Sequence, residues 1–198
     1  MVPNQWHILH RTHSSIHTSQ EEGGVFHLQY VGSENEVSSH LFPSSYYATV
    51  SSHDMLPLFE RVVFLISNVS LSSSWCVGVT AREGPSTDHH AFYDSTFYGV
   101  HSNGRSLWRF DGGSPDLVLD TFSNHSSMVK MRIRWHADRG DLPLIIELIT
   151  DHQPPLCLGW RIPRCVARPF FFLVSLTPNS GMTISPPSIG EEKEEESY

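Results

Sequence analysis

Short runs in which apolar and polar residues alternate recur along most of the chain, and they predict β-strands. The clearest pair lies between residues 128 and 146. In its first run, three apolar residues alternate with four cationic or potentially cationic ones: Met131, Ile133 and Trp135 against Lys130, Arg132, Arg134 and His136. A period of two places one set on each face of a strand. Residues 137–141 (ADRGD) favour a reversal, and residues 142–146 (LPLII) form a second apolar run. This stretch therefore predicts a long β-hairpin with one buried and one solvated face.

The same pattern predicts strands elsewhere, over residues 25–31, 46–50, 61–69, 75–80, 97–101, 106–110, 117–119, 169–175 and 182–184. Between two of these runs stands Asn103-Gly104, a dipeptide that favours the type I′ turn of a tight hairpin. No long apolar stripe of helical period accompanies them, so little helix is expected. Many short strands with regular turn signals predict an all-β fold, an antiparallel two-sheet β-sandwich of the jelly-roll type.

The chain divides into a central domain and two polar ends. Residues 1–24 are rich in His and Ser, and we expect a flexible arm with one short segment docked near Trp6, Ile8 and Leu9. Residues 25–186 form the predicted sandwich domain. Residues 187–198 end in EEKEEESY, and a block of like charges of this kind is usually a solvated, disordered acidic tail.

Charge and cysteine content narrow the functional classes. A net charge of −8 argues against a nucleic-acid partner, which usually requires a basic surface. No apolar run approaches the roughly 20 residues of a membrane span, and the first residues lack the apolar core of a secretory signal. Cys76, Cys157 and Cys165 cannot all pair and form no CxxC motif. We expect an intracellular protein, cytoplasmic or nuclear and not secreted, with no membrane contact.

The sequence predicts no catalytic, metal-binding or cofactor-binding residues. Signatures of nucleotide binding, of a nucleophile elbow and of zinc sites are absent. The spacing of His10, His13 and His17 would align them on a helix, but the segment lacks helix formers. Cys76 lies inside an apolar run, which favours an inert buried thiol. The acidic pairs Glu34/Glu36 and Asp138/Asp141 fall in predicted turns, unlike the opposed carboxylates of a glycan hydrolase.

Several motifs in their order resemble those of the SPRY domain, a concanavalin A-like β-sandwich, of which this chain would be a divergent member. They are WCVGV at residues 75–79, YGVHSNG at 98–104, the pair at 128–146, and the PFFFLVSL and GMTI runs at 169–176 and 181–184. The resemblance covers roughly residues 25–186. It implies a non-catalytic protein–protein interaction module that presents loops at one end of the sandwich to a short peptide segment of a partner.

The resemblance directs attention to three loops, at residues 82–90, 103–104 and 152–155. The candidate partner-binding residues are Tyr93, Asp94, His101, Arg105 and Trp108. Tyr98 is a further aromatic candidate. Because Trp108 and Arg109 are neighbours on one strand, only one of them can face outward.

Two other functions, and the role of one cationic strand face, remain open at this point. A carbohydrate-binding module on the same fold would stack sugars on exposed aromatic rings and could hold calcium through carboxylates. A glycan hydrolase would require two carboxylates in one cleft. The cationic face of Lys130, Arg132 and Arg134 is either a solvated strand face or a basic stripe that meets an acidic partner or the chain's own Glu-rich end.

Overall fold

The computed structural model describes residues 8–9, 16–31, 48–52, 55–56, 62–70, 74–81, 95–103, 106–119, 128–135, 142–150, 153–162 and 169–189. These residues form strands and turns, and none of them belongs to a helix. Accordingly, the described part of the chain offers no helix that is long and apolar enough to cross a membrane.

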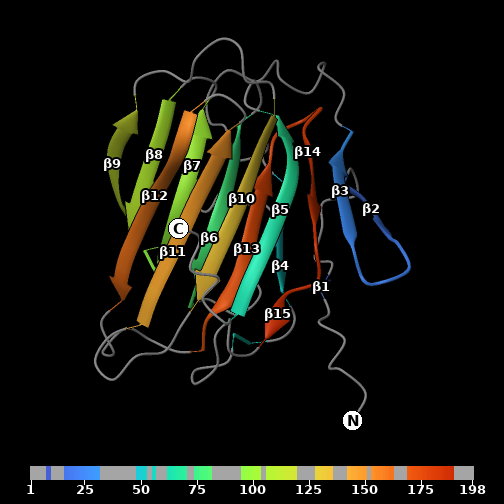
Figure 1. Ribbon diagram of the computed structural model, residues 1–198, viewed down its shortest axis with the longest axis horizontal. Coiled ribbons are helices and arrows are strands. Elements are labelled where there is room, and N and C mark those ends of the chain that lie inside the picture. The colour runs from blue at the N-terminus through green and yellow to red at the C-terminus, as the bar shows by residue number, and fades with distance from the viewer. Residues whose placement is uncertain are drawn as a thin grey trace.

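Two antiparallel sheets are stacked face to face (Figure 1). In spatial order, the first consists of β1 (Ile8–Leu9), β4 (Ala48–Ser52), β13 (Phe171–Leu176), β6 (Trp75–Thr80), β7 (Phe97–Asn103), β8 (Ser106–Asp111) and β9 (Ser114–Leu119). The second consists of β12 (Gln153–Ile162), β11 (Leu142–Thr150), β10 (Met128–Trp135), β5 (Val62–Ser70), β14 (Gly181–Ile184), β3 (Phe26–Tyr30) and β2 (Ile16–Gln20), while β15 (Ser188–Ile189) also pairs with β5. We call them the seven-stranded and the eight-stranded sheet. They confirm the predicted β-sandwich.

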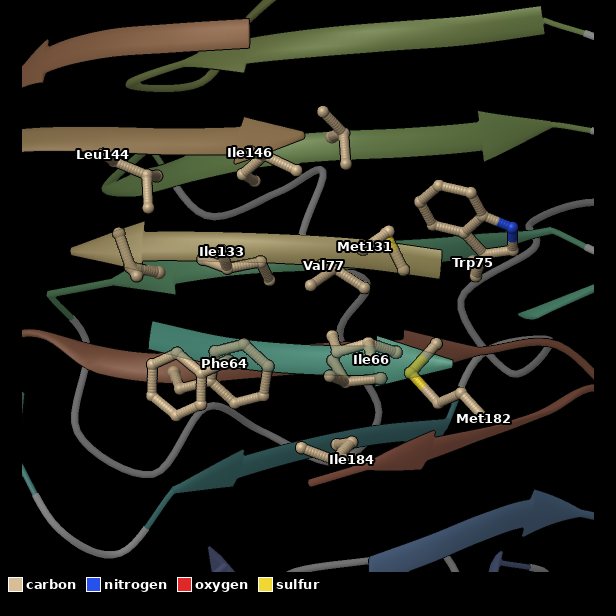
Figure 2. Packing of buried hydrophobic residues seen from close by; sticks show 14 of the residues in the cluster. Phe64, Ile66, Trp75, Val77, Met131, Ile133, Leu144, Ile146, Met182 and Ile184 are labelled. Atoms are coloured by element: carbon tan, nitrogen blue, oxygen red, sulfur yellow. The ribbon is translucent and has the colours of Figure 1, made fainter. Parts of the chain in front are cut away.

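The predicted central hairpin is formed by β10 and β11, and its apolar face lines the core. Ile133 of β10 lies opposite Ile146 of β11 and opposite Phe64 of β5, and all three are fully buried. The ring of Phe64 stacks on Phe172 of the seven-stranded sheet with centroids 4.5 Å apart. Stacked contacts between large rings add to the free energy gained by burying their area. Figure 2 shows Phe64, Ile133 and Ile146 in the space between the sheets.

The two sheets differ in how much of their outer faces is buried. Along β10 the burial alternates, as expected for a sheet with one solvated face. In the seven-stranded sheet, every residue of β6 and β13 is buried. A second cluster on the outer face of that sheet contains Cys76, Phe97, Phe110 and Leu173. This explains why the WCVGV and FFFLVS runs are continuously apolar rather than alternating.

The sandwich has two ends, which we name after residues that mark them. At the Trp75 end, β6 begins, β7 and β13 finish, and the β13–β14 turn is fixed by backbone bonds from Tyr30 N to Ser180 O and from Thr177 N to Ser74 O. At the Phe97 end, β7 begins and β6 finishes. Figure 2 shows Trp75, Met131 and Met182 together at the first end of the core.

The boundaries of the predicted arm and tail need correction. Within the predicted arm over residues 1–24, β1 is the short docked segment that was expected near Ile8 and Leu9. Strand β2 was not expected, and it pairs with the edge of β3 while burying Ile16. Ser188 and Ile189, placed in the tail by the sequence, form β15 against β5. In both cases backbone pairing to an available strand edge overrides a polar local composition. The remaining residues of both ends lie outside the described residues.

Strand β12 is absent from the sequence prediction, which expected a loop at residues 152–155. Two prolines stand near its start, and proline is unfavourable within a strand because it lacks an N–H group. Because β12 is an edge strand, a missing N–H group there removes no bond of the sheet interior. The signal was nevertheless present, since Leu158, Trp160 and Ile162 alternate with residues of the outer face and are buried.

Candidate functional site

Two of the five predicted contact residues, His101 and Trp108, lie opposite each other on β7 and β8. They share the outer face of the seven-stranded sheet with Cys76, which is the partner of His101 on β6. The His101 side chain is 2% exposed and packs edge-on against Phe110. Burial lowers the pKa of His101 from 6.5 to about 4, because the charged imidazolium loses its hydration. His101 is therefore a neutral packed residue and not a surface contact, which corrects the prediction.

Trp108 is partly buried and packs against the cluster of Cys76, Phe97, Phe110 and Leu173. Its neighbour on the edge strand β9 is Leu117, which is 42% exposed. Pro115, also exposed, lies opposite Phe110 on the same face. We call Trp108, Pro115 and Leu117 the Trp108 patch. It is an apolar surface at the β8–β9 edge of the sheet. The side chain of its tryptophan packs on the buried cluster named above.

Arg109 points the opposite way from Trp108, into the space between the sheets. Its guanidinium lies over the ring of Trp160, 5.1 Å from the centroid, and 3.6 Å from Asp111. The Trp160 indole Nε1 donates to the carbonyl of Phe110 at 2.6 Å. These contacts tie β12 of one sheet to β8 of the other. Of the two neighbours, Trp108 therefore faces outward, and Arg109 faces inward. The contacts of Arg109 and of the Phe110 carbonyl with Trp160 fix β8 from its inner side.

The other three predicted contacts, Tyr93, Asp94 and Arg105, lie outside the described residues. In the sequence, Tyr93 and Asp94 precede β7 and Arg105 follows it. Of the five predicted residues, the structure therefore describes His101 and Trp108, and it places these two side by side on neighbouring strands.

The three predicted loops fall largely outside the described residues. Residues 82–90 and Gly104 are not among them. The strand before the first loop, β6, finishes at the Phe97 end, whereas β7, which includes Asn103, finishes at the Trp75 end. Of residues 152–155, the last three belong to β12 and not to a loop.

Tyr98 is also not a surface aromatic. Its side chain is 6% exposed and faces the core, where its ring meets Phe170 edge-on with centroids 6.5 Å apart. Cys76 is fully buried, and burial raises the pKa of its thiol well above the ordinary value. This agrees with the inert thiol expected from the sequence. Cys157 is a free, exposed thiol on β12.

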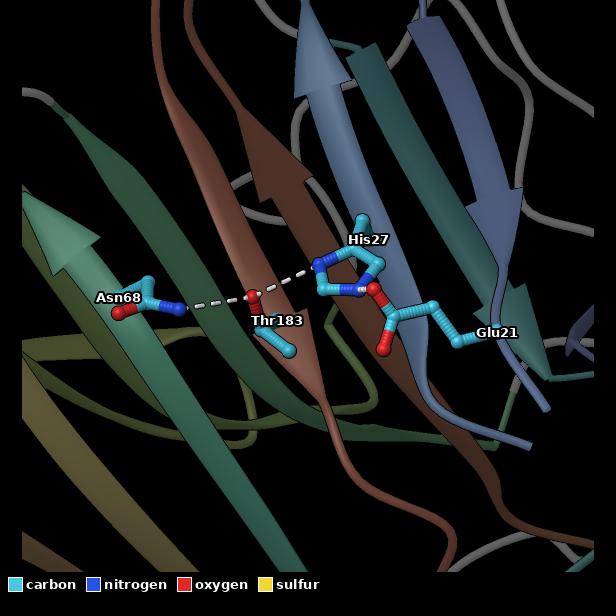
Figure 3. Close-up of polar contacts among 4 residues, drawn as sticks. All are labelled: Glu21, His27, Asn68 and Thr183. Carbon is cyan, nitrogen blue, oxygen red and sulfur yellow. Dashed lines mark hydrogen bonds and ion pairs between the residues drawn. The ribbon is translucent and has the colours of Figure 1, made fainter. Parts of the chain in front are cut away.

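A polar relay crosses the outer face of the eight-stranded sheet (Figure 3). The amide Nδ2 of Asn68 donates to Thr183 Oγ1 at 3.1 Å, and that hydroxyl lies 3.1 Å from Nδ1 of His27. His27 Nε2 is 3.0 Å from a carboxylate oxygen of Glu21. A hydroxyl, an imidazole and a carboxylate in this order resemble a nucleophile with its base.

The surroundings of this relay do not suit catalysis. Thr183 sits in mid-sheet, paired with Ser67 on one side and with His27 on the other. Neighbouring strands thus lie on both sides of its backbone, whereas an oxyanion site needs backbone N–H groups that point at the reacting atom. We assign the relay to joining β5, β14 and β3. In the part of the chain that the structure describes, no three His, Cys, Asp or Glu residues are grouped so as to hold a metal ion.

Pro115 and Leu117 are the two residues of the Trp108 patch that are not among the candidates predicted from the sequence. Residues 117–119 form an apolar run, and from such a run the outward residue cannot be identified. The pairing of Trp108 with Leu117 identifies it, because directly opposed residues point to the same face of a sheet. The acidic pairs Glu34/Glu36 and Asp138/Asp141 lie outside the described residues.

No family model matches the sequence, and no curated protein sequence matches it either. Solved structures do. The TRIM65 PSpry domain matches 90% of this chain and 86% of its own, with a TM-score of 0.55 and 12% identity. Peanut lectin, in a structure with a nine-residue peptide, matches 93% and 96%, with a TM-score of 0.54 and 9% identity. Lectin I-B4 from Griffonia simplicifolia, in its metal-free form, matches 89% and 91%, with a TM-score of 0.51 and 7% identity. At these identities the likeness shows a shared SPRY-like and concanavalin-like sandwich fold.

Proposed function

We propose that the protein is a non-catalytic interaction module that binds a short peptide segment of a partner protein through the Trp108 patch and the adjoining sandwich-end loops. The observation that carries the proposal is the placement of Trp108. Its side chain is held against a buried cluster and still keeps part of its surface accessible beside the exposed Leu117.

An aromatic side chain in this position suits peptide binding for an energetic reason. Tryptophans that are already immobilised before binding lose little conformational entropy, and they dominate the binding energy of many interfaces. The inner side of β8 is fixed by Arg109 and by the bond from Trp160 to the Phe110 carbonyl. The patch is therefore pre-organised. Its apolar surface favours a peptide that carries an aliphatic or aromatic side chain.

The comparisons support this proposal at the level of the fold. One similar structure is a PSpry domain, and the peanut lectin structure contains a nine-residue peptide. The position of Thr183 in mid-sheet, paired on both sides, supports the non-catalytic part.

Carbohydrate binding is the second candidate, and the same ring favours it. Two of the similar structures are lectins, and an accessible tryptophan face can stack on a sugar. The two candidates differ in ligand and not in location, so one set of variants serves both.

The experiment presents the full chain in parallel to a random peptide library and to a glycan array. A matched pair of variants locates the site: Leu117→Ala lies in the Trp108 patch, and Leu65→Ala replaces a leucine of equal exposure, 41%, on the eight-stranded sheet. Enriched peptides that lose binding to the Leu117 variant alone support the proposal. Glycan binding with the same pattern would favour the second candidate, and selected ligands indifferent to Leu117 and to Trp108→Ala would reject the site.

A further inference from the structure

The outer face of the eight-stranded sheet carries a concentrated positive charge on an otherwise acidic chain. Its described cations are Lys130, Arg132, Arg134 and Arg161, which we call the basic stripe. Lys130, Arg132 and Arg161 are exposed, and Arg134 is partly buried. Glu147 is the described carboxylate among them, so four cations and one anion give this area a net charge of +3, against −8 for the chain.

Glu147 neutralises only part of the stripe. It lies opposite Arg132 in the β10–β11 register, and its two oxygens are 3.5 Å from Arg132 and 2.6 Å from Arg134. One carboxylate thus serves two guanidinium groups, and Lys130 has the apolar Ile149 as its neighbour on β11. The stripe retains capacity for further carboxylates.

Strand β15 brings the end of the described chain to this face. Ser188 lies opposite Val63 of β5, and Val63 lies opposite Arg134 of β10. Neighbouring strands are about 4.8 Å apart, so the backbone of Ser188 is about 10 Å from that of Arg134, in the same cross-strand row. Residues 191–196 follow almost at once. They comprise five glutamates and one lysine, with a net charge of −4.

We propose that the acidic segment 191–196 binds the basic stripe of its own chain. Gly190 separates it from β15 and allows the reversal that is needed to turn back over the sheet. Six extended residues reach about 20 Å, and the stripe from Lys130 to Arg134 is about 13 Å long. The segment therefore matches the stripe in length, in charge and in point of attachment.

Tethering compensates for the weakness of the single contacts. An exposed ion pair contributes little by itself, and salt screens it. A segment attached two strands away acts at a high effective concentration, so several weak pairs together suffice to hold it. An acidic segment of another molecule would have to displace it. The bound segment thus shields the basic stripe from other acidic molecules. This role is separate from the function proposed for the Trp108 patch, which lies on the other sheet.

The test exploits the lysine content of the chain, since Lys130 and Lys193 are its two lysines. A carbodiimide joins an amine to a carboxylate only when they are in direct contact. We expect the full chain to form an amide between Lys130 and a glutamate of residues 191–196, identified by mass spectrometry of the monomer. The yield should fall about tenfold in 1 M salt, where the Debye length is about 3 Å. Arg132→Gln should lower the yield severalfold.

A relocated amine provides the matched control. In the double variant Lys130→Arg, Gln29→Lys, the stripe keeps its charge, and the amine moves to exposed Gln29 on β3 of the same sheet. No cross-link from position 29 to residues 191–196 is expected. Equal cross-linking at position 29, an insensitivity to salt, or no cross-link at Lys130 would overturn the proposal. So would cross-links that join an isotopically labelled chain to an unlabelled one, because they would indicate binding to a second copy.

Discussion

Gly78 of β6 and Gly99 of β7 face each other across the seven-stranded sheet, and the ring of Phe97 occupies the space that their side chains would fill. A Cβ atom added to Gly78 would lie 2.8 Å from the Phe97 ring and 2.7 Å from the Cα of Gly99. The two glycines thus leave room for the Phe97 ring, which packs in one cluster with Cys76, Phe110 and Leu173. The cluster that supports Trp108 depends on this close approach.

Replacing either glycine should therefore weaken the whole fold. We expect Gly78→Ala or Gly99→Ala to lower the free energy of unfolding by about 3 kcal/mol, because the added atom overlaps backbone as well as the Phe97 ring. Urea denaturation measures this. Gly159→Ala is the control: nothing lies within 4 Å of a Cβ at this exposed site, and the change should be neutral or slightly stabilising. Similar effects at all three positions would contradict the packing described for Phe97.

Buried His101 should make stability depend on pH. Its pKa is about 4 in the folded protein and about 6.5 when unfolded, so the unfolded chain binds more protons between these values. The stabilising effect of deprotonation is complete above pH 6.5 and is lost as the pH falls toward 4, by on the order of 3 kcal/mol. His101→Gln should remove this part of the profile in urea titrations at several pH values. His17→Gln, at an exposed position, controls for the loss of a histidine, and an unchanged profile in the His101 variant would contradict the assignment.

The two described cysteines should react very differently. Cys157 is exposed on the edge strand β12, whereas Cys76 is fully buried and its pKa is raised. Iodoacetamide followed by peptide mass spectrometry should find Cys157 modified in the native protein and Cys76 modified only after urea is added. Early modification of Cys76 would mean that the cluster around Phe97 opens readily.

Much of the fold could be predicted because period-two patterns translate directly into buried and exposed faces. The registers of β10 and β11 place Met131, Ile133 and Trp135 in the core, as the alternation indicated. Strand β6 was predicted with its observed bounds, Trp75–Thr80. Among the edge strands, residues 117–119 of β9 were predicted, whereas β12 was missed and β2 was assigned to a flexible end, because β12 begins with two prolines and β2 is largely polar.

The site was less predictable because exposure depends on what covers a face. His101 alternates with apolar residues in the manner of a half-exposed strand, yet the outer face of its sheet is itself buried. Only the three-dimensional register pairs Trp108 with Leu117 and turns Arg109 toward Trp160. Alternation of apolar and polar residues separates the two faces of a strand. It does not show how far each face is buried in the folded protein.

The polar contacts of Trp160 between the sheets should add to the free energy of unfolding, beyond what the packing of its ring contributes. Trp160→Phe leaves the buried Phe110 carbonyl without the indole donor 2.6 Å away, and we expect a loss of about 1–3 kcal/mol. Arg109→Gln should cost less than 1 kcal/mol by itself. Combined in a double-mutant cycle, the two changes should be less than additive, because both remove the guanidinium–indole contact. Full additivity would contradict the observed stacking.

The most direct test of the account is the dissociation constant of one library-selected peptide for three forms of the full chain. Isothermal calorimetry should show binding to Leu117→Ala weakened at least about tenfold, the effect of about 1.4 kcal/mol at a contact in the binding site. Binding to Leu65→Ala, at an equally exposed leucine on the other sheet, should match the wild type. Equal affinities for all three forms, or a loss confined to the Leu65 variant, would contradict the assignment of function to the Trp108 patch.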